Sequence, residues 1–242
     1  MFEPLIPFLI LGGIAALWWW MRRRYQRGGN TIRESALRQG LTYTSRQDEV
    51  LSLFTVTPFD RADQSAEHVV NGELAGTAFL TFRHVSLSPV AHSLHRISPV
   101  DAAVNGVSKR VAPELRGADT RQVLAITLPG SLRPVAFGPT SLRHVERTLG
   151  SSLDVESADF NRRWLLAQGD TQDALALLTP TVVSLMLDLS RRSMWMAVDG
   201  NQLVLQRVGG GHSLDWLDAE VATLARIRDA IPHHLYGADF AP

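Results

Sequence analysis

The chain contains no cysteine among its 242 residues. This absence excludes disulfide bonds, thiolate metal sites, iron–sulfur clusters and cysteine nucleophiles together. Net charge is absent as well, because 24 acidic residues balance 24 basic ones, of which only Lys109 is a lysine. Strongly charged classes such as histone-like proteins are therefore excluded.

The signatures of the large enzyme classes are also missing. The sequence holds no Gly-x-Ser-x-Gly, no His-Glu-x-x-His, no P-loop and no Gly-x-Gly-x-x-Gly at a strand-to-helix turn. His92 and His95 have a spacing that a metal could use, but no carboxylate cluster accompanies them. Two loose carboxylate groups are interpreted as solvated faces: Asp60, Asp63 and Glu67, and Asp154, Glu156 and Asp159. We therefore predict no enzymatic activity, no cofactor and no metal; an enzyme of unrecognised type is an alternative.

What the sequence does contain is one long uncharged run near its start. Residues 4–21 carry no charge, and as a helix they would span roughly 27 Å, close to the hydrocarbon thickness of a bilayer. Aromatic residues stand at the end of this run and basic residues follow it, in the order typical of a cytoplasmic membrane exit. The predicted membrane-interface residues are Trp18, Trp19, Trp20, Arg22, Arg23, Arg24 and Arg27. We predict a single-pass anchor in the inner (plasma) membrane, with the N-terminus outside and the rest of the chain cytoplasmic.

A cleaved signal peptide and an interfacial helix are the alternatives to a retained anchor. A signal peptide needs basic residues before its apolar run and small residues after it. Here residues 1–4 contain Glu3 and no basic residue, and three tryptophans stand where small side chains would be needed. This order favours the retained anchor.

The overall neutrality hides two unlike parts. Residues 1–30 carry four arginines and one glutamate, a net charge of +3, so residues 31–242 carry −3. A net negative domain does not attract a polyanion, which argues against nucleic acid as a partner. The expected partners are membrane lipids, through the N-terminal helix, and other membrane protein subunits.

The pattern predicts an α+β fold, in which antiparallel hairpins pack with helices. The domains are the anchor over 1–27, a linker over 28–30 and the α+β domain over 31–242. The expected helices cover 31–40, 48–54, 140–149, 170–178, 182–189 and 213–231. The expected strands cover 41–45, 68–71, 77–85, 122–128, 134–137, 153–156, 163–167, 193–198 and 202–208.

Two hairpins and one long excursion stand out in this pattern. The first hairpin has its turn within 72–76, the second has Asp-Gly-Asn at 199–201, and a further turn is expected at Pro129-Gly130. Residues 87–120 hold three prolines and no sustained period, so we interpret them as a long surface excursion.

One glycine-rich loop is a candidate anion site. Gly209, Gly210 and Gly211 precede Ser213, the expected N-cap of the last helix, and free backbone amides there could face a phosphate. No basic residue follows on the first turn, however, and Asp215 and Asp218 would repel an anion. A plain strand-to-helix connector is the alternative.

Several segments resemble an uncharacterised group of actinobacterial proteins, often with one N-terminal membrane span. The resemblance covers residues 50–235 and is carried by VVNGELAGTAFLTFRH (69–84), ITLPG (126–130), DFNRRWLL (159–166), MWMAVDGNQLVLQR (194–207) and IPHHL (231–235). It implies a cytoplasmic α+β module, with no assigned activity and no catalytic residues to carry over. The 87–120 excursion would then be an insertion peculiar to this chain.

Two functional hypotheses follow from these observations. The first is a non-enzymatic, single-pass accessory or interaction subunit of a larger membrane protein complex, with an actinobacterial respiratory assembly as one candidate host. The second is a membrane-tethered sensor of a small ligand or lipid headgroup, using the 209–211 loop or a groove beside the excursion.

Overall fold

The computed structural model describes residues 31–56, 59, 64–87, 118–140, 153, 155–189, 194–208 and 213–236. The predicted anchor and linker, the loop 209–211, residues 141–149 of the helix predicted over 140–149 and residues 88–117 of the excursion lie outside these ranges.

The described residues build one antiparallel sheet, and this confirms the predicted α+β class. Its strands are β1 (Thr42–Arg46), β2 (Gln64–Leu74), β3 (Thr77–Leu87), β4 (Ala118–Pro139), β5 (Trp164–Gln168) and β6 (Met194–Val208). The order is β1-β2-β3-β4-β5, and β6 pairs with β4. Leu87 pairs with Ala118, so strands continue into both ends of the predicted excursion.

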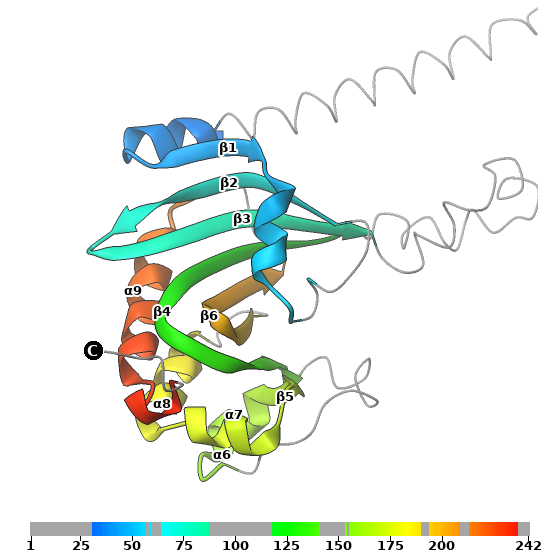
Figure 1. Cartoon of the computed structure of the whole chain (residues 1–242), viewed down its shortest axis with the longest axis vertical. Coiled ribbons are helices and arrows are strands. Elements are labelled where there is room, and N and C mark those ends of the chain that lie inside the picture. Colours follow the sequence, from blue (N-terminus) through cyan, green and yellow to red (C-terminus); the bar gives the residue numbers. More distant parts are fainter. Residues whose placement is uncertain are drawn as a thin grey trace, which may run out of the picture.

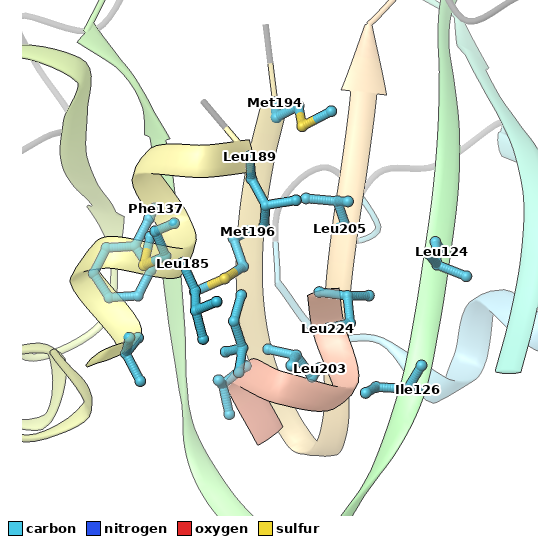
Figure 2. Close-up of a cluster of buried hydrophobic side chains, with 14 of the residues drawn as sticks. Leu124, Ile126, Phe137, Leu185, Leu189, Met194, Met196, Leu203, Leu205 and Leu224 are labelled. Atoms are coloured by element: carbon cyan, nitrogen blue, oxygen red, sulfur yellow. The ribbon is translucent and has the colours of Figure 1, made fainter. Parts of the chain in front are cut away.

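Strands β4 and β6 form the centre of the sheet. Antiparallel pairing runs from Arg121 with Val208 to Phe137 with Met196. Residues an odd number apart in a straight strand face opposite sides. Val198 and Leu203 nevertheless share one buried cluster, as do Leu128 and Val135 of β4, so both chains reverse direction. The two arms of β6 lie side by side between the arms of β4 (Figures 1 and 2).

Helices cover one face of this sheet. They are α6 (Ala158–Arg163), α7 (Thr171–Leu177), α8 (Pro180–Leu189), α9 (Leu217–Ala230), a first helix over 31–38, and the short η3 (His233–Leu235). Leu124, Ile126 and Leu205 pack there with Leu224 of α9 and Leu185 of α8 (Figure 2). This cluster is the main core, and burial of such side chains is the dominant favourable term in folding.

The opposite face is covered by η1 (Asp48–Leu53) and the residues after it. Val50, Phe54 and Phe59 pack there on Phe82 and Val123. The Phe54 ring lies 4.7 Å from that of Phe59 and 5.8 Å from that of Phe82, in tilted geometries. The sheet is thus buried on both faces.

The helix over 31–38 ends as the sequence predicts. Gly40 has φ of +71°, which glycine adopts without strain. The Leu41 amide donates to the Ala36 carbonyl (2.9 Å), and the Gly40 amide donates to that of Leu37 (3.1 Å). This is a Schellman ending. It directs Leu41 into the main core and the chain into β1.

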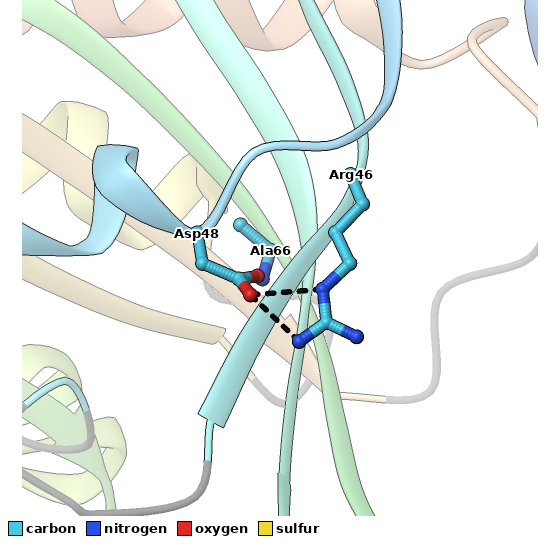
Figure 3. A network of polar contacts seen from close by, with 3 residues as sticks. All are labelled: Arg46, Asp48 and Ala66. Atoms are coloured by element: carbon cyan, nitrogen blue, oxygen red, sulfur yellow. Dashed lines mark hydrogen bonds and ion pairs between the residues drawn. The ribbon is translucent and has the colours of Figure 1, made fainter.

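An ion pair fixes η1 to the edge of the sheet (Figure 3). Arg46 donates from Nε (2.8 Å) and Nη2 (2.6 Å) to Asp48 Oδ2, and the Ala66 amide donates to Asp48 Oδ1 (3.0 Å). The Arg46 hydrogen bond lowers the pKa of Asp48. A lowered pKa means that this contribution to stability is present at neutral pH and is lost as the pH falls through that pKa.

A buried carboxylate holds the segment after η1. Asp199, at the tip of β6, is 4% exposed. It accepts hydrogen bonds from the Thr55 hydroxyl (2.7 Å), the Thr55 amide and the Val56 amide (3.0 Å). A buried carboxylate needs such donors, because an unpaired charge in the interior is costly. Asp199 therefore joins the β6 tip to the layer on the second face.

Three expectations are wrong or need adjustment. Leu153, Val155 and Glu156 lie in no strand, so the expected strand over 153–156 is wrong where it is described. Helix α9 begins at Leu217, because the chain makes a turn at 215–216 first, and not at Ser213. The first hairpin turns on Ala75 and Gly76 alone, since Leu74 already pairs with Thr77.

The membrane span is not shown by the described residues. None of their helices is by itself both long and apolar enough to cross a bilayer. Helices α7 and α8 pass that test only as a pair, and they are bent by 89° at the break between them.

The Asp199 contact gives a first prediction. Asp199→Asn replaces one carboxylate oxygen by an NH₂ group, which cannot accept the hydrogen bonds that Thr55 and Val56 donate. We expect the unfolding free energy to fall by about 1–3 kcal/mol. Urea denaturation followed by tryptophan fluorescence measures this. Glu73→Gln, at an exposed position of β2, is the control. Equal stability of the two variants would contradict the assigned role.

The first hairpin gives a second prediction. Ala75 has φ of +49°, which costs a non-glycine residue roughly 1–2 kcal/mol, whereas asparagine tolerates this region. We expect Ala75→Asn to raise the unfolding free energy by about 1 kcal/mol. Gly76→Ala is the control, because nothing lies within 4 Å of its added Cβ. That variant should lose stability through its φ of +79° alone.

Candidate functional site

Helix α8 lies between two open grooves, and these form the candidate functional site. The helix starts at Pro180, where a missing amide proton costs nothing. Thr179 precedes it, and its hydroxyl accepts from the Val182 amide (3.3 Å). Val182, Leu185 and Met186 are buried in the core, whereas Ser184 and Asp188 are exposed.

The larger groove, the α6–α8 groove, has a volume of about 640 Å³. Such a volume is in the range of small-molecule sites. Its aliphatic lining is Val155, Leu178, Pro180, Val183 and Leu187, and its polar lining is Glu156, Ser157 and Ser184. The floor is formed by Leu178 and Val183, which are buried.

Local hydrogen bonds fix the wall of this groove opposite α8. The Asn161 amide group donates to the Val155 carbonyl (2.7 Å) and its oxygen accepts from the Val155 amide (3.2 Å). Ser157 is the N-cap of α6, because its hydroxyl accepts from the Phe160 amide (3.3 Å). The segment 155–157 is therefore held in place without a regular strand.

The smaller groove, the α8–α9 groove, has a volume of about 350 Å³. Its lining residues are Asp188, Leu189, Met194, Trp216, Ala219, Glu220 and Thr223. The Trp216 indole donates from Nε1 to the Ser213 carbonyl (2.8 Å). The Arg207 guanidinium lies 4.9 Å from the centre of the Trp216 ring, a cation–π contact. The ring is thus fixed at the start of α9, beside two carboxylates.

The predicted site residues fall unevenly on the structure. The membrane-interface residues 18–20, 22–24 and 27 and the glycines 209–211 lie outside the described residues. Ser213 is described, but it does not cap α9, whose N-cap is Trp216. The Ser213 hydroxyl accepts instead from the Asp215 amide (3.1 Å). The first turn carries Asp218 and Glu220, so the helix end gives an anion no support.

The described histidines do not gather into a group of metal ligands. His92 and His95 lie outside the described residues. His84 is fully buried, and its Nε2 is 2.9 Å from Gln64 Oε1. Gln64 Nε2 donates to the Phe59 carbonyl (2.6 Å), so its oxygen faces His84 and the histidine is the donor. The residues that the structure describes contain no group of three potential metal ligands.

Sequence reasoning did not find the two grooves. Their lining comes from segments far apart in the chain, such as 155–157 with 178–187, and no local spacing joins them. One signal was available in α8. The helix is apolar around most of its circumference, which is typical of a buried helix. Leu187 is nevertheless left half-buried beside the groove.

Comparisons with known proteins support the fold and assign neither a family nor a function. No family model matches the chain, and no curated protein matches it. Among solved structures, the crystal structure of the mycobacterial trehalose monomycolate transport factor A, TtfA, is similar with a TM-score of 0.53. The likeness covers 84% of this chain and 93% of that one, at 13% sequence identity. The two proteins share an α+β architecture over most of their lengths.

The Trp216 contacts give a third prediction. Trp216→Phe keeps a ring in the α8–α9 groove but removes the hydrogen bond to Ser213. We expect the unfolding free energy to fall by about 0.5–1.5 kcal/mol. Faster amide hydrogen exchange over 213–216 should accompany this loss. The control is Arg226→Gln, at an exposed position on the same helix. Unchanged exchange in Trp216→Phe would show that the indole does not hold this turn.

Proposed function

We propose that the protein is a non-enzymatic accessory subunit of a larger membrane protein complex, tethered by its N-terminal segment. The observation that carries this proposal is the fold likeness to TtfA, which is named as a transport factor and spans 84% of this chain. Its mycobacterial source also agrees with the actinobacterial resemblance of the sequence. A transport assembly is therefore a better supported host than a respiratory one.

The proposed arrangement places the described domain at the cytoplasmic surface of the membrane. Its support is the order of apolar run, tryptophans and arginines over residues 4–27, and the short distance along the chain from Arg27 to the helix that starts at Thr31. A domain tethered so closely meets a membrane-embedded partner at high effective concentration.

The α8–α9 groove is the proposed contact with that partner. Tryptophan and arginine are among the residue types enriched in interface hot spots. Trp216 lines this groove, and Arg207, which is not in the lining, lies over the Trp216 ring. Both side chains are half-buried. The indole hydrogen bond fixes the ring before any partner binds, which reduces the entropy cost of association.

A membrane-tethered ligand sensor is the second candidate function. The observation that favours it is the α6–α8 groove, which has the volume of a small-molecule site and an open, fixed lining. TtfA is named as a trehalose monomycolate transport factor, and its fold likeness is compatible with either proposal.

A single-cysteine cross-linking experiment tests the accessory role, since the chain has no cysteine of its own. Ala219→Cys places the only thiol in the α8–α9 groove, and Ala176→Cys places it at an exposed position of α7. A membrane-impermeant thiol-reactive cross-linker is added to inverted and right-side-out membrane vesicles from the native host. We expect Ala219→Cys to capture one membrane protein in inverted vesicles only.

The control and the vesicle orientation separate the outcomes. Ala176→Cys should be modified in the same vesicles without that cross-link. Modification in right-side-out vesicles would overturn the cytoplasmic placement. A full chain that stays uncross-linked at Ala219→Cys, and that purifies from mild detergent at its own mass, would overturn the accessory role.

A further inference from the structure

We propose that the exposed side of the first helix, residues 31–38, lies against the anionic head-group surface of the membrane. This contact rests on the membrane tether proposed above, and it adds a direct contact between the folded domain and lipid. It involves neither of the two grooves along α8.

The first helix uses only one of its sides to pack on the domain. Ile32 and Ala36, one helical turn apart, are buried in the main core. The opposite side is exposed and consists of Arg33, Glu34, Leu37 and Arg38. This surface can therefore meet a membrane without any change in the fold.

Leu37 is the apolar centre of this surface. Its side chain is 58% exposed, compared with 52% for Leu53 and 42% for Leu175, the other large apolar side chains that are exposed in the described part of the chain. A leucine flanked by basic residues is typical of helices that lie in the plane of a membrane interface. Contact with the boundary between head groups and acyl chains would remove Leu37 from water.

The charges on this surface favour an anionic partner. Arg33 and Arg38 outnumber Glu34, and neither arginine is in an ion pair within the described ranges. Arg38 donates from Nε to the backbone carbonyl of Glu34 (3.3 Å), a bond that leaves its positive charge uncompensated. Anionic lipids attract basic residues that are held close to the bilayer surface.

The length of the tether keeps this helix close to the head groups. Thr31 follows Arg27, the last predicted interface residue, by four residues, which span at most about 14 Å when fully extended. A helix with its side chains is about 10–12 Å wide. The first helix (blue in Figure 1) lies at one end of the domain and α7 lies at the other. The tether therefore holds the first helix, and not α7, within about one helix width of the membrane.

Quenching by lipid-borne nitroxide tests this contact on the full chain in nanodiscs of phosphatidylcholine and phosphatidylglycerol. Leu37→Cys and its matched control Leu175→Cys each place one thiol on an exposed leucine, because the chain has no cysteine of its own. Both are labelled with bimane, and circular dichroism verifies that both are folded. With the nitroxide on the lipid head group, we expect strong quenching at 37 and little at 175. Equal quenching at the two positions would overturn the proposed contact.

A third label separates this proposal from the tether on which it rests. Ala15→Cys lies in the middle of the predicted anchor, so a nitroxide on the acyl chain should quench a label there. Quenching at 15 without selective quenching at 37 would overturn the lipid contact alone. Selective quenching at 37 without quenching at 15 would support the contact and overturn the tether. Absence of both would overturn both proposals.

Charge variants of the labelled Leu37→Cys chain test the preference for anionic lipid. Arg33→Gln and Arg38→Gln should each lower the ratio of quenched to unquenched label, read from fluorescence lifetimes, by about fivefold. Glu34→Gln should raise this ratio, and Arg226→Gln, at an exposed position of α9, should leave it unchanged. All these differences should vanish in pure phosphatidylcholine. Equal ratios in the two lipid compositions would overturn the role of the arginines.

Discussion

The pairing of β4 with β6 is the constraint on which the rest of the structure depends. The β6 chain reverses direction inside the reversal of β4, so that β4 pairs with it from Arg121 to Phe137. This arrangement places Leu124 and Ile126 on the helix face of the sheet and Val123 and Ala125 on the other. Both cores are therefore built on one pair of strands. Bringing together two strands that are far apart in the sequence costs loop-closure entropy. Burial of apolar side chains on both faces of the sheet offsets this cost.

The two layers on the sheet are fastened in different ways. On the helix face, α8 and α9 are held mainly by burial of apolar side chains. On the other face, the short η1 has few residues to bury, and polar contacts supplement its packing at both ends. Asp48 joins its start to Arg46 and Ala66, and Asp199 holds the Thr55–Val56 backbone after its end. These carboxylates are satisfied by donors, so they are structural groups and not free acids or bases.

The candidate site results from the way in which α8 is packed. The sheet and α9 cover only part of the apolar surface of α8. Helix α6 is six residues long and leaves some of the remaining surface open. The remaining apolar surface lines the α6–α8 groove, where the irregular segment 155–157 forms the far wall. At the C-terminal end of α8, Trp216 lines a second, more polar groove together with Asp188 and Glu220. A single helix thus presents surfaces of two different chemistries.

The sequence by itself determined the α+β class, the helix that ends at Gly40, and the reversals at 75–76, 129–130 and 199–201. These depend on hydrophobic period and on glycine, which are local properties. Only the tertiary structure decided that β6 lies inside β4, that Ser213 does not cap α9, and that 155–157 forms a groove wall without being a strand. Such outcomes depend on contacts between segments far apart in the chain. No local pattern encodes which remote side chains will share one surface, and for that reason the grooves along α8 could not be predicted.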